Sequence, residues 1–422
     1  MLFFLPLREM KSFQRNLFTL ALVISGFGSF ADTTDVLFIG NSYTNYNNLP
    51  SLVIQVAISA GDTLYTESRT PGGRRISQHA ADPQVFSKIR SRDWDYVVIQ
   101  CQSQEPSFSD GQVAADVLPY AKILCDSIRA NNACTIPMFY MTWGRKNGDA
   151  SNCPFFPPLC TYEGMDSILR SNYLKMGEQN DAEVAGVGAV WRELRTTTPS
   201  LELYTNDESH PSYAGSLASA YTFYSSIFRK KATNASYNGS VAAVFADSIR
   251  KVVDRVIASS PEAYNIGVSE PTSEFTITQD DCLFSFEAPS GFASYQWIFG
   301  DGTMESIEDP SHEYAANGPY IVKLIVTDGC GAVDSTTQEV TCGLNNVNRL
   351  SNEEAPIYPN PSKGNFSLKG NLELVSIHLL DGKVIDYTQE GKTYTVGKIV
   401  SGILILTLKE GDRLFYQRVL VE

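Results

Sequence analysis

Two hydrophobic patterns alternate along the chain from Asp35 to about Ser260. Apolar runs of strand length stand between longer stretches in which apolar residues recur at helical spacing. The strand-like runs are DVLFIG (35–40), DTLYTES (62–68), DYVVIQ (95–100), TIPMFYMTW (135–143) and AEVAGVG (182–188). The helix-like stretches are 49–61, 112–132 (interrupted by Pro119), 161–180, 189–195, 212–228 and 241–259. This alternation predicts an α/β domain over residues 32–260, with a parallel sheet covered by helices on both faces.

The pattern changes at Pro261, after which only short strand-like runs occur. The stretch SSPEAYNIGVSEPTSE (259–274) is rich in Ser, Pro and Glu, and predicts a linker over residues 261–271. The chain beyond it divides into two small all-β sandwich domains, over residues 272–342 and 355–422, with a second linker at 343–354. A length of 422 residues fits such a division into several cores.

The N-terminus carries a targeting pattern. Arg8, Lys11 and Arg15 precede an apolar stretch, LFTLALVISGFGSFA (17–31), which ends on a small-x-small motif. This arrangement predicts a signal peptide over residues 1–31 and an exported chain that starts at Asp32. No later stretch is apolar for long enough to predict a membrane span.

The net charge and the cysteines bear on the possible partners of the chain and on its disulfides. The formal net charge is -14, which argues against a nucleic-acid-binding surface. Export favours disulfides among the eight cysteines. Cys153 and Cys160 are predicted to close one short loop, and Cys125 and Cys134 are candidates to close another. Cys/His spacing typical of a structural zinc site does not occur, so no metal is expected.

Histidine is scarce enough to limit the candidates for a catalytic base. The chain has four: His79, His210, His312 and His378, and the last two fall in the all-β segments. His210 stands in NDESHPSYAG, three residues after Asp207, a spacing that lets the carboxylate orient the imidazole. Ser42 follows the first predicted strand in VLFIGNSYTNYNNLP and is the candidate nucleophile.

These motifs together resemble the SGNH/GDSL hydrolase superfamily over residues 33 to 260. Gly40-Asn41-Ser42 corresponds to its first block, Gly72-Gly73 to its second, and Asp207 with His210 to its last. The resemblance implies a flavodoxin-like α/β/α domain of three layers. It also implies an acyl-enzyme mechanism with Ser42 as nucleophile, His210 as base and Asp207 as its orienting acid.

The third block departs from the family pattern. Where the family has Gly-x-Asn-Asp after strand three, this chain has VVIQCQSQEPS. The departure is similar to a subgroup related to carbohydrate esterases, in which Gln ends the strand. Gln100 is the first candidate to donate to the oxyanion, followed by Gln102 and then Gln104. The backbone N–H groups of Ser42 and of Gly73 or Gly72 would complete the oxyanion hole.

Three further residues are candidates for the cleft: Asn41, His79 and Trp143. His79 either lines the cleft near the leaving group or packs under Arg74 and Arg75. Trp143 either stacks on a sugar ring or packs in the core. The reaction implied by the resemblance needs no cofactor.

The two all-β segments carry resemblances of their own. YQWIFGDGT (295–303), followed by DPSHEY and GPYIV, is similar to the PKD domain, an immunoglobulin-like sandwich. PIYPNPSKGNFSL (356–368) resembles the start of the type A C-terminal sorting domain of type IX secretion in Bacteroidota. That resemblance implies the type IX machinery as a partner and a secreted or surface-attached product.

Two functions remain open on the sequence. One is a secreted serine esterase acting on acylated carbohydrate, with acetyl as the expected acyl group. The other is a catalytically inactive surface protein that binds polysaccharide or protein through the PKD-like module. The presence of Ser42, Asp207 and His210 together favours the esterase.

Overall fold

The computed structural model describes residues 33–342, 357–379, 383–396, 402–410 and 413–421. The proposed signal peptide and the linker at 343–354 lie outside these residues. The chain divides into two units, Met1–Ser269 and Glu270–Glu422, and each is described by itself. Among the described residues, no helix is both long and apolar enough to cross a membrane.

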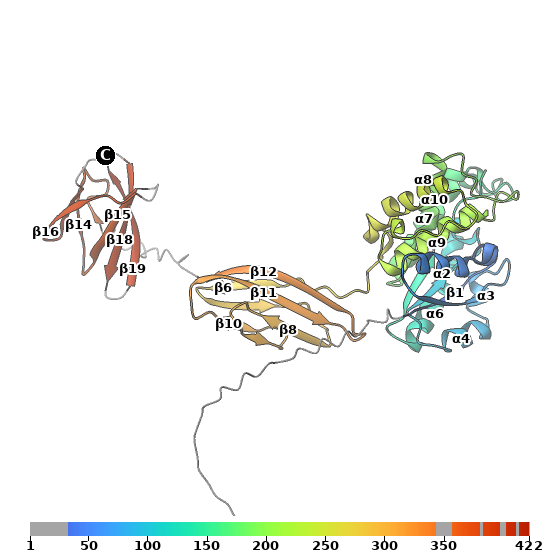
Figure 1. The fold of residues 1–422 in the computed structure, drawn as a ribbon, viewed down its shortest axis with the longest axis horizontal. Helices are drawn as coiled ribbons and strands as arrows, with labels where there is room; N and C mark the ends of the chain where they lie inside the picture. Colours follow the sequence, from blue (N-terminus) through green and yellow to red (C-terminus); the bar gives the residue numbers. More distant parts are fainter. Residues whose placement is uncertain (1–32, 343–356, 380–382, 397–401, 411–412, 422) are drawn as a thin grey trace, which may run out of the picture. The chain divides into compact units, whose positions relative to one another are not determined.

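The first unit is built on a five-stranded parallel sheet in the order β2-β1-β3-β4-β5. Its strands are β1 (Thr34–Ile39), β2 (Leu64–Arg69), β3 (Tyr96–Ile99), β4 (Ile136–Tyr140) and β5 (Glu183–Ala185). Figure 1 labels β1 of this sheet and several of the helices around it. The central strands are apolar on both sides, and the side chains from Val36 to Ile39 are fully buried. That burial is expected of a parallel sheet covered on both faces.

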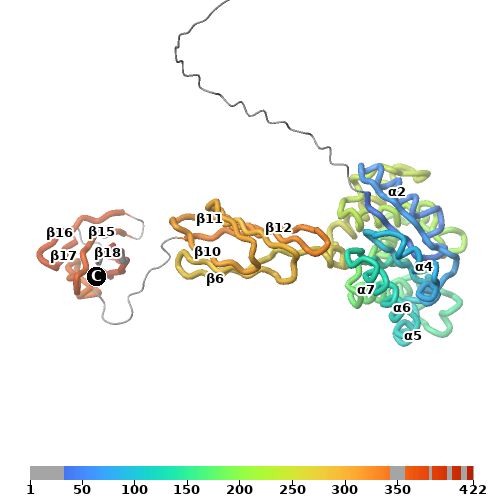
Figure 2. The backbone as a smooth tube through the Cα atoms, turned by 90° about the horizontal axis from the view of Figure 1, so that it is seen from below, coloured from blue at the N-terminus to red at the C-terminus, as the bar shows by residue number. Residues whose placement is uncertain are grey.

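Helices cover both faces of this sheet. They are α1 (Ser42–Asn45), α2 (Leu49–Ser59), α3 (Ile76–His79), α4 (Pro83–Ile89), α5 (Asp110–Asp116), α6 (Leu118–Asn131), α7 (Tyr162–Gln179), α8 (Val187–Thr197), α9 (Tyr213–Phe228) and α10 (Ala243–Val253). Helix α9 packs on α2, α8 and α10, while α4 packs on α6. Figure 2 shows α2 on the opposite side of the unit from α6 and α7. The predicted flavodoxin-like α/β fold is confirmed, and the helix interrupted by Pro119 divides into α5 and α6.

The first unit extends beyond the boundary that composition predicted at Ser260. Pro261–Tyr264 forms a short 3-10 helix, and Tyr264 and Ile266 are buried in the core of the unit. Asn265 and Gly267 bond to Ala182 and Glu183, beside β5. The chain therefore packs on the α/β unit over the first part of the stretch that its Ser, Pro and Glu content marked as a linker.

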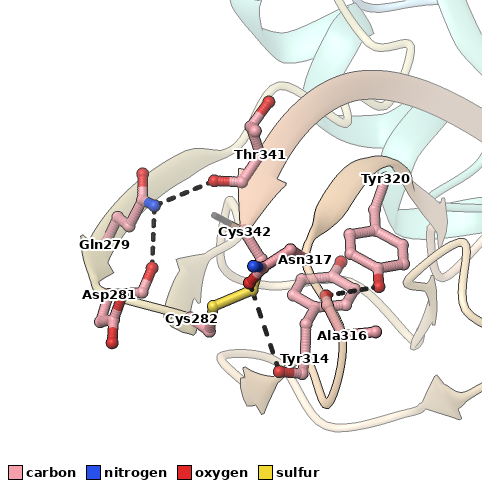
Figure 3. Close-up of a disulfide and its surroundings, with 9 residues drawn as sticks. All are labelled: Gln279, Asp281, Cys282, Tyr314, Ala316, Asn317, Tyr320, Thr341 and Cys342. Carbon is pink, nitrogen blue, oxygen red and sulfur yellow. Dashed lines mark hydrogen bonds between the residues drawn. A yellow bond between two sulfur atoms is a disulfide. The ribbon is translucent and has the colours of Figure 1, made fainter. Parts of the chain in front are cut away.

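The second unit begins with a β-sandwich of two antiparallel sheets, β10-β7-β6 and β12-β11-β8-β9. The strands are β6 (Thr276–Asp280), β7 (Leu283–Glu287), β8 (Ser294–Ile298), β9 (Met304–Glu305), β10 (Ser311–Glu313), β11 (Gly318–Thr327) and β12 (Val333–Cys342). Phe286 of β7 and Trp297 of β8 meet in the core between the sheets. A disulfide joins Cys282, before β7, to Cys342 at the end of β12 (Figure 3).

The last segment also forms two antiparallel sheets around one apolar core. Their orders are β13-β14-β17-β16 and β15-β18-β19. The strands are β13 (Ile357–Tyr358), β14 (Asn365–Leu368), β15 (Glu373–Leu379), β16 (Tyr387–Glu390), β17 (Thr393–Val396), β18 (Gly402–Glu410) and β19 (Arg413–Val421). Phe366, Ile377 and Leu406 lie in the shared core. The predicted succession of one α/β domain and two small all-β segments is thus present.

One predicted disulfide is confirmed and one is wrong. Cys153 and Cys160 are bonded across the short loop that contains PFFPPL. Cys125 is a free thiol buried on α6, so it does not pair with Cys134. The spacing alone suggested that pair, but the apolar face of α6 directs Cys125 into the core.

Candidate active site

The candidate nucleophile, Ser42, follows the turn between β1 and α1. Strand β1 ends at Ile39, and Ser42 is the first residue of α1. A Cβ on Gly40 would lie 2.5 Å from Thr44 Oγ1 and 2.7 Å from Gln100 Oε1, so this turn requires glycine. Asn41 caps the helix, because its Oδ1 accepts a hydrogen bond from the Tyr43 N–H. The triplet Gly40-Asn41-Ser42 after the buried strand therefore forms the tight turn that holds Ser42 at the start of α1.

Ser42, His210 and Asp207 form a continuous hydrogen-bonded triad. His210 Nε2 lies 2.8 Å from Ser42 Oγ, and His210 Nδ1 lies 2.5 Å from Asp207 Oδ2. A carboxylate only accepts hydrogen bonds, so Nδ1 carries the proton and Nε2 is left to accept that of Ser42. This is the geometry in which an imidazole acts as general base toward a hydroxyl.

The Asp207 carboxylate is held in its ionised form. Burial by itself would raise its pKa, but the hydrogen bond with the His210 ring and those from two backbone N–H groups outweigh that effect. The result is a pKa well below the ordinary value. Thr205 Oγ1 adds a further donor at 2.8 Å. Asp207 is thus able to stabilise an imidazolium at His210 throughout the neutral range.

Trp143 packs beneath the loop that carries Asp207 and His210 and bonds to it. Its side chain is fully buried, stacks on Tyr43 and Trp191, and donates from Nε1 to the carbonyl of Ser209, next to His210. Tyr43 also bonds to Ser209, through Oη and Oγ at 2.6 Å. Of the two roles open to Trp143, the structure has the core one, and the sugar-stacking alternative does not fit a buried ring.

Gln100 and Asn41 form a buried amide pair beneath the nucleophile. Gln100 Oε1 accepts from the Asn41 N–H and from Thr44 Oγ1, and Gln100 Nε2 donates to Asn41 Oδ1 and to Cys101 O. Both amide hydrogens are thereby engaged inside the protein. Gln100 therefore does not fit the predicted role of oxyanion donor, because glutamine, one bond longer than asparagine, folds back onto Asn41.

The glycine loop is bound to this amide pair. Asn41 Nδ2 donates to the carbonyl of Arg74 at 3.2 Å, which fixes the loop that carries Gly72 and Gly73. Gly73 has a φ of +67°, a conformation that favours glycine. Within the described part of the chain, the N–H groups of Ser42, Gly72 and Gly73 donate to no protein acceptor. Ser42 N–H, with that of Gly73 or Gly72, remains the candidate set for the oxyanion hole, while Asn41 positions the loop rather than lining the cleft.

Gln102 and Gln104 belong to a network beside the loop. Gln102 Nε2 donates to Gln104 Oε1, and Gln104 Nε2 donates to the buried carboxylate of Asp149. Arg145 Nη1 pairs with the same carboxylate at 3.0 Å. In each of these two glutamines, one hydrogen of the side-chain amide takes no part in these bonds. In Gln100, both amide hydrogens are already donated to protein acceptors.

Glu105, which the sequence did not single out, joins two loops of the site. Its Oε2 accepts from the N–H groups of Ile76 and Gln102, linking the start of α3 to the segment after β3. Burial raises the pKa of this carboxyl. A single acid within a polar stretch gives no sequence signal of such a role, which depends on contacts made 29 residues away.

His79 lies in the protein interior rather than in the cleft. Its side chain is fully buried, and neither ring nitrogen has a hydrogen-bond partner among the described residues. Burial, together with the nearby Arg74 guanidinium, lowers its pKa to about 4. Of its two predicted placements, the structure has the packed one.

Comparisons with known proteins identify one segment by family. Residues 258–342 match the family model of the PKD domain, which confirms that resemblance. Collagenase ColA of Bacillus cereus is 32% identical over 95 residues, and Collagenase ColA of Clostridium perfringens is 29% identical over 126 residues. The matches cover 22% and 28% of this chain, and the chain spans about a tenth of the length of these relatives (10% and 11%).

Solved structures similar to this chain include hydrolases. A DUF4886 family protein from Bacteroides uniformis has a TM-score of 0.48 at 16% identity, covering 54% of this chain and 95% of that one. A candidate SGNH hydrolase from Slackia heliotrinireducens has a TM-score of 0.37 at 23% identity, with coverage of 46% and 98%. An acetyl xylan esterase from Geobacillus stearothermophilus has a TM-score of 0.32 at 14% identity, with coverage of 46% and 94%. Similarities at this level carry no functional argument, so the activity is argued from the triad itself.

Among the described residues, no group of three or more His, Cys, Asp or Glu side chains is arranged to hold a metal ion. A serine hydroxyl, an imidazole and an ionised carboxylate that are hydrogen-bonded in that order, near the carboxyl end of a parallel strand, can carry out nucleophilic acyl transfer.

Proposed function

We propose that the α/β unit is a serine esterase that hydrolyses carboxylic esters, with acyl groups on carbohydrate, above all acetyl, as its substrates. The observation that supports this most directly is the pair of contacts of His210, to Ser42 at 2.8 Å and to Asp207 at 2.5 Å. The position agrees with it. Ser42 follows β1 and the Gln100 segment follows β3, where the strand order of the sheet reverses and ligands of α/β proteins bind.

The proposed reaction has two halves. Ser42 Oγ bonds to the ester carbonyl carbon while its proton passes to His210 Nε2, and the N–H groups of Ser42 and of Gly73 or Gly72 receive the oxyanion. The bond from carbon to the alcohol oxygen then breaks, and His210 returns the proton to that oxygen. In the second half a water molecule gives a proton to His210 and its oxygen bonds to the acyl carbon. The bond from that carbon to Ser42 Oγ then breaks, and His210 gives the proton to Oγ, which releases the acid and restores Ser42.

The substrate class and the location are parts of the same proposal. Acetylated carbohydrate is suggested by the sequence resemblance to esterases of that class, and export by the signal-peptide pattern and the sorting-domain resemblance. The PKD domain is proposed to space the catalytic unit from the C-terminal segment. No cofactor is included.

The test is hydrolysis of 4-nitrophenyl acetate by residues 32–422, compared with the Ser42→Ala variant. We expect activity in the first and its loss in the second, with unchanged melting temperature. Ser91→Ala, which removes an exposed hydroxyl on the surface, is the matched control and should retain full activity. Equal rates for Ser42→Ala and the parent chain would remove Ser42 from its role. An inert parent chain would favour the alternative of a non-catalytic binding protein.

A further inference from the structure

An exposed aromatic ring lies against the catalytic imidazole. Tyr46 stacks on His210 with ring centroids 4.4 Å apart and an interplanar angle of 19°, and 37% of its surface remains exposed. Tyr43 contacts the same imidazole edge-on at 5.3 Å but is buried. Of these two rings, Tyr46 is therefore the one that also reaches solvent.

The local backbone is shaped to hold this ring in place. Tyr46 begins the 3-10 turn Tyr46–Asn48, and Asn47 and Asn48 both have positive φ, 52° and 51°. Asparagine tolerates that left-handed conformation better than most residues. Asn47 Nδ2 donates to Pro211 O, Ser212 O and Ser216 Oγ. The turn that carries Tyr46 is thus fastened to the segment that follows His210.

The reaction fixes which part of the substrate lies near this ring. His210 Nε2 returns its proton to the oxygen of the departing alcohol, so that alcohol must lie within hydrogen-bond reach of Nε2. Tyr46 stacks on the same imidazole. The stacking brings the Tyr46 ring close to the place that the departing alcohol must occupy.

We propose that Tyr46 is a specificity-determining residue that forms the alcohol subsite and packs against the apolar face of a sugar ring. The inference rests on the proposed esterase function and deepens it. An aromatic ring offers a flat apolar face, and it is already held by His210 and by the Asn47 anchor, so little ordering cost remains when a second ring packs on it. This is the function that the sequence had offered to Trp143, whose ring is buried.

The test compares two acetates of primary alcohols that differ in the presence of a ring: methyl glucoside acetylated at O6, and 2-hydroxyethyl acetate. Acetate release is measured for the parent chain (residues 32–422) and for Tyr46→Ala, Tyr46→Phe and Tyr65→Ala. Tyr65 is an equally exposed tyrosine on β2, paired with Asp35 at the end of β1 away from Ser42, and serves as the matched control.

We expect Tyr46→Ala to lower kcat/KM for the sugar acetate about three- to tenfold more than for the glycol acetate. Tyr46→Phe should keep the preference for the sugar, because the ring remains, and Tyr65→Ala should keep both rates. Equal losses on both acetates in Tyr46→Ala would overturn the subsite, since Tyr46 would then act only through His210. Unchanged ratios in all variants would overturn it as well. Failure of the parent chain on both acetates and on 4-nitrophenyl acetate would instead reject the esterase function itself.

Discussion

Replacing one carboxylate oxygen of Asp207 by nitrogen, in Asp207→Asn, tests the role of this residue in the triad. In Asp207→Asn, the amide oxygen can still accept the backbone N–H groups of Ser209 and His210, so the loop should keep its shape. The amide nitrogen would face His210 Nδ1 as a donor and favour the tautomer with the proton on Nε2. We expect kcat for 4-nitrophenyl acetate to fall by about 10⁴ with little change in melting temperature.

Glu208→Gln is the control for this experiment. It changes the neighbouring acid, whose contact is with Asn147 at the surface, and should leave kcat within about twofold. A kcat for Asp207→Asn close to that of the parent chain would show that another group orients His210.

Gln100 separates two roles that sequence could not distinguish. As an oxyanion donor, it would affect kcat and leave stability nearly unchanged. As the buried partner of Asn41 and Thr44, its replacement by alanine leaves several polar groups without partners. We expect Gln100→Ala to lose about 3 kcal/mol of unfolding free energy together with activity, measured by urea denaturation.

Gln102→Ala gives the comparison. Its side chain is only partly buried and bonds within one loop, so a loss below about 1 kcal/mol is expected. A stable but inactive Gln100→Ala protein would restore the oxyanion role to Gln100.

The triad could be predicted from sequence, whereas the residues around it could not. Ser42 follows an apolar strand, and Asp207 and His210 are close enough in sequence to meet by local geometry. Gln100, Trp143 and Tyr46 depend on side-chain direction, which is set by packing between distant segments. Gln100 folds onto Asn41, Trp143 stacks on the buried Trp191, and Tyr46 stays partly exposed.

At the scale of elements, the imidazole of His79 in helix α3 should lower the stability of the folded chain in acid. His79, at the end of α3, has a folded pKa of about 4 against an ordinary 6.5, with Arg69, Arg74 and Asp82 as its charged neighbours. Between these values the unfolded chain binds a proton at His79 that the folded chain does not. Stability should therefore fall as pH decreases from about 6.5 to about 4, by at most about 3.4 kcal/mol.

The measurement is urea denaturation at several pH values for the parent chain and for His79→Leu. The variant has no titrating group at this position, so its stability should change less over the same range. Parallel pH dependence in the two proteins would assign the acid sensitivity to other groups.

The disulfide of the PKD domain is a second prediction at this scale. Cys282 and Cys342 close a loop with a sequence separation of 60, which restricts the unfolded chain considerably. Replacing both with serine should cost that domain about 4 kcal/mol by the loop-entropy relation. The same change at Cys153 and Cys160, with a separation of 7, should cost about 2.5 kcal/mol in the α/β unit.

Calorimetry would distinguish the two pairs, because each double variant should lower the transition of its own unit. If both double variants lowered a single shared unfolding transition by similar amounts, the two disulfides would not stabilise separate cores.

The described part of the molecule combines the α/β unit, which holds the triad, with two β segments that contribute no residue to it. Most of the fold was predictable at this scale, because hydrophobic periods of helix and strand type occupy separate parts of the sequence. The end of the α/β unit was not. Tyr264 and Ile266 are isolated apolar residues in a polar stretch, so they form no hydrophobic pattern in the sequence. Their burial becomes visible only in the structure, where they pack into the core of the α/β unit next to β5.

The proposed export makes the last prediction. In a host with type IX secretion, the full chain should appear outside the outer membrane with Asp32 at its N-terminus, while a chain lacking residues 355–422 should remain in the periplasm. Immunoblots of culture medium, surface and periplasmic fractions measure this, with N-terminal sequencing of the exported product. Ser42→Ala is the control and should be exported like the parent, since sorting does not need catalysis. Surface appearance of the truncated chain would contradict the sorting role and leave the last segment as an ordinary β-sandwich.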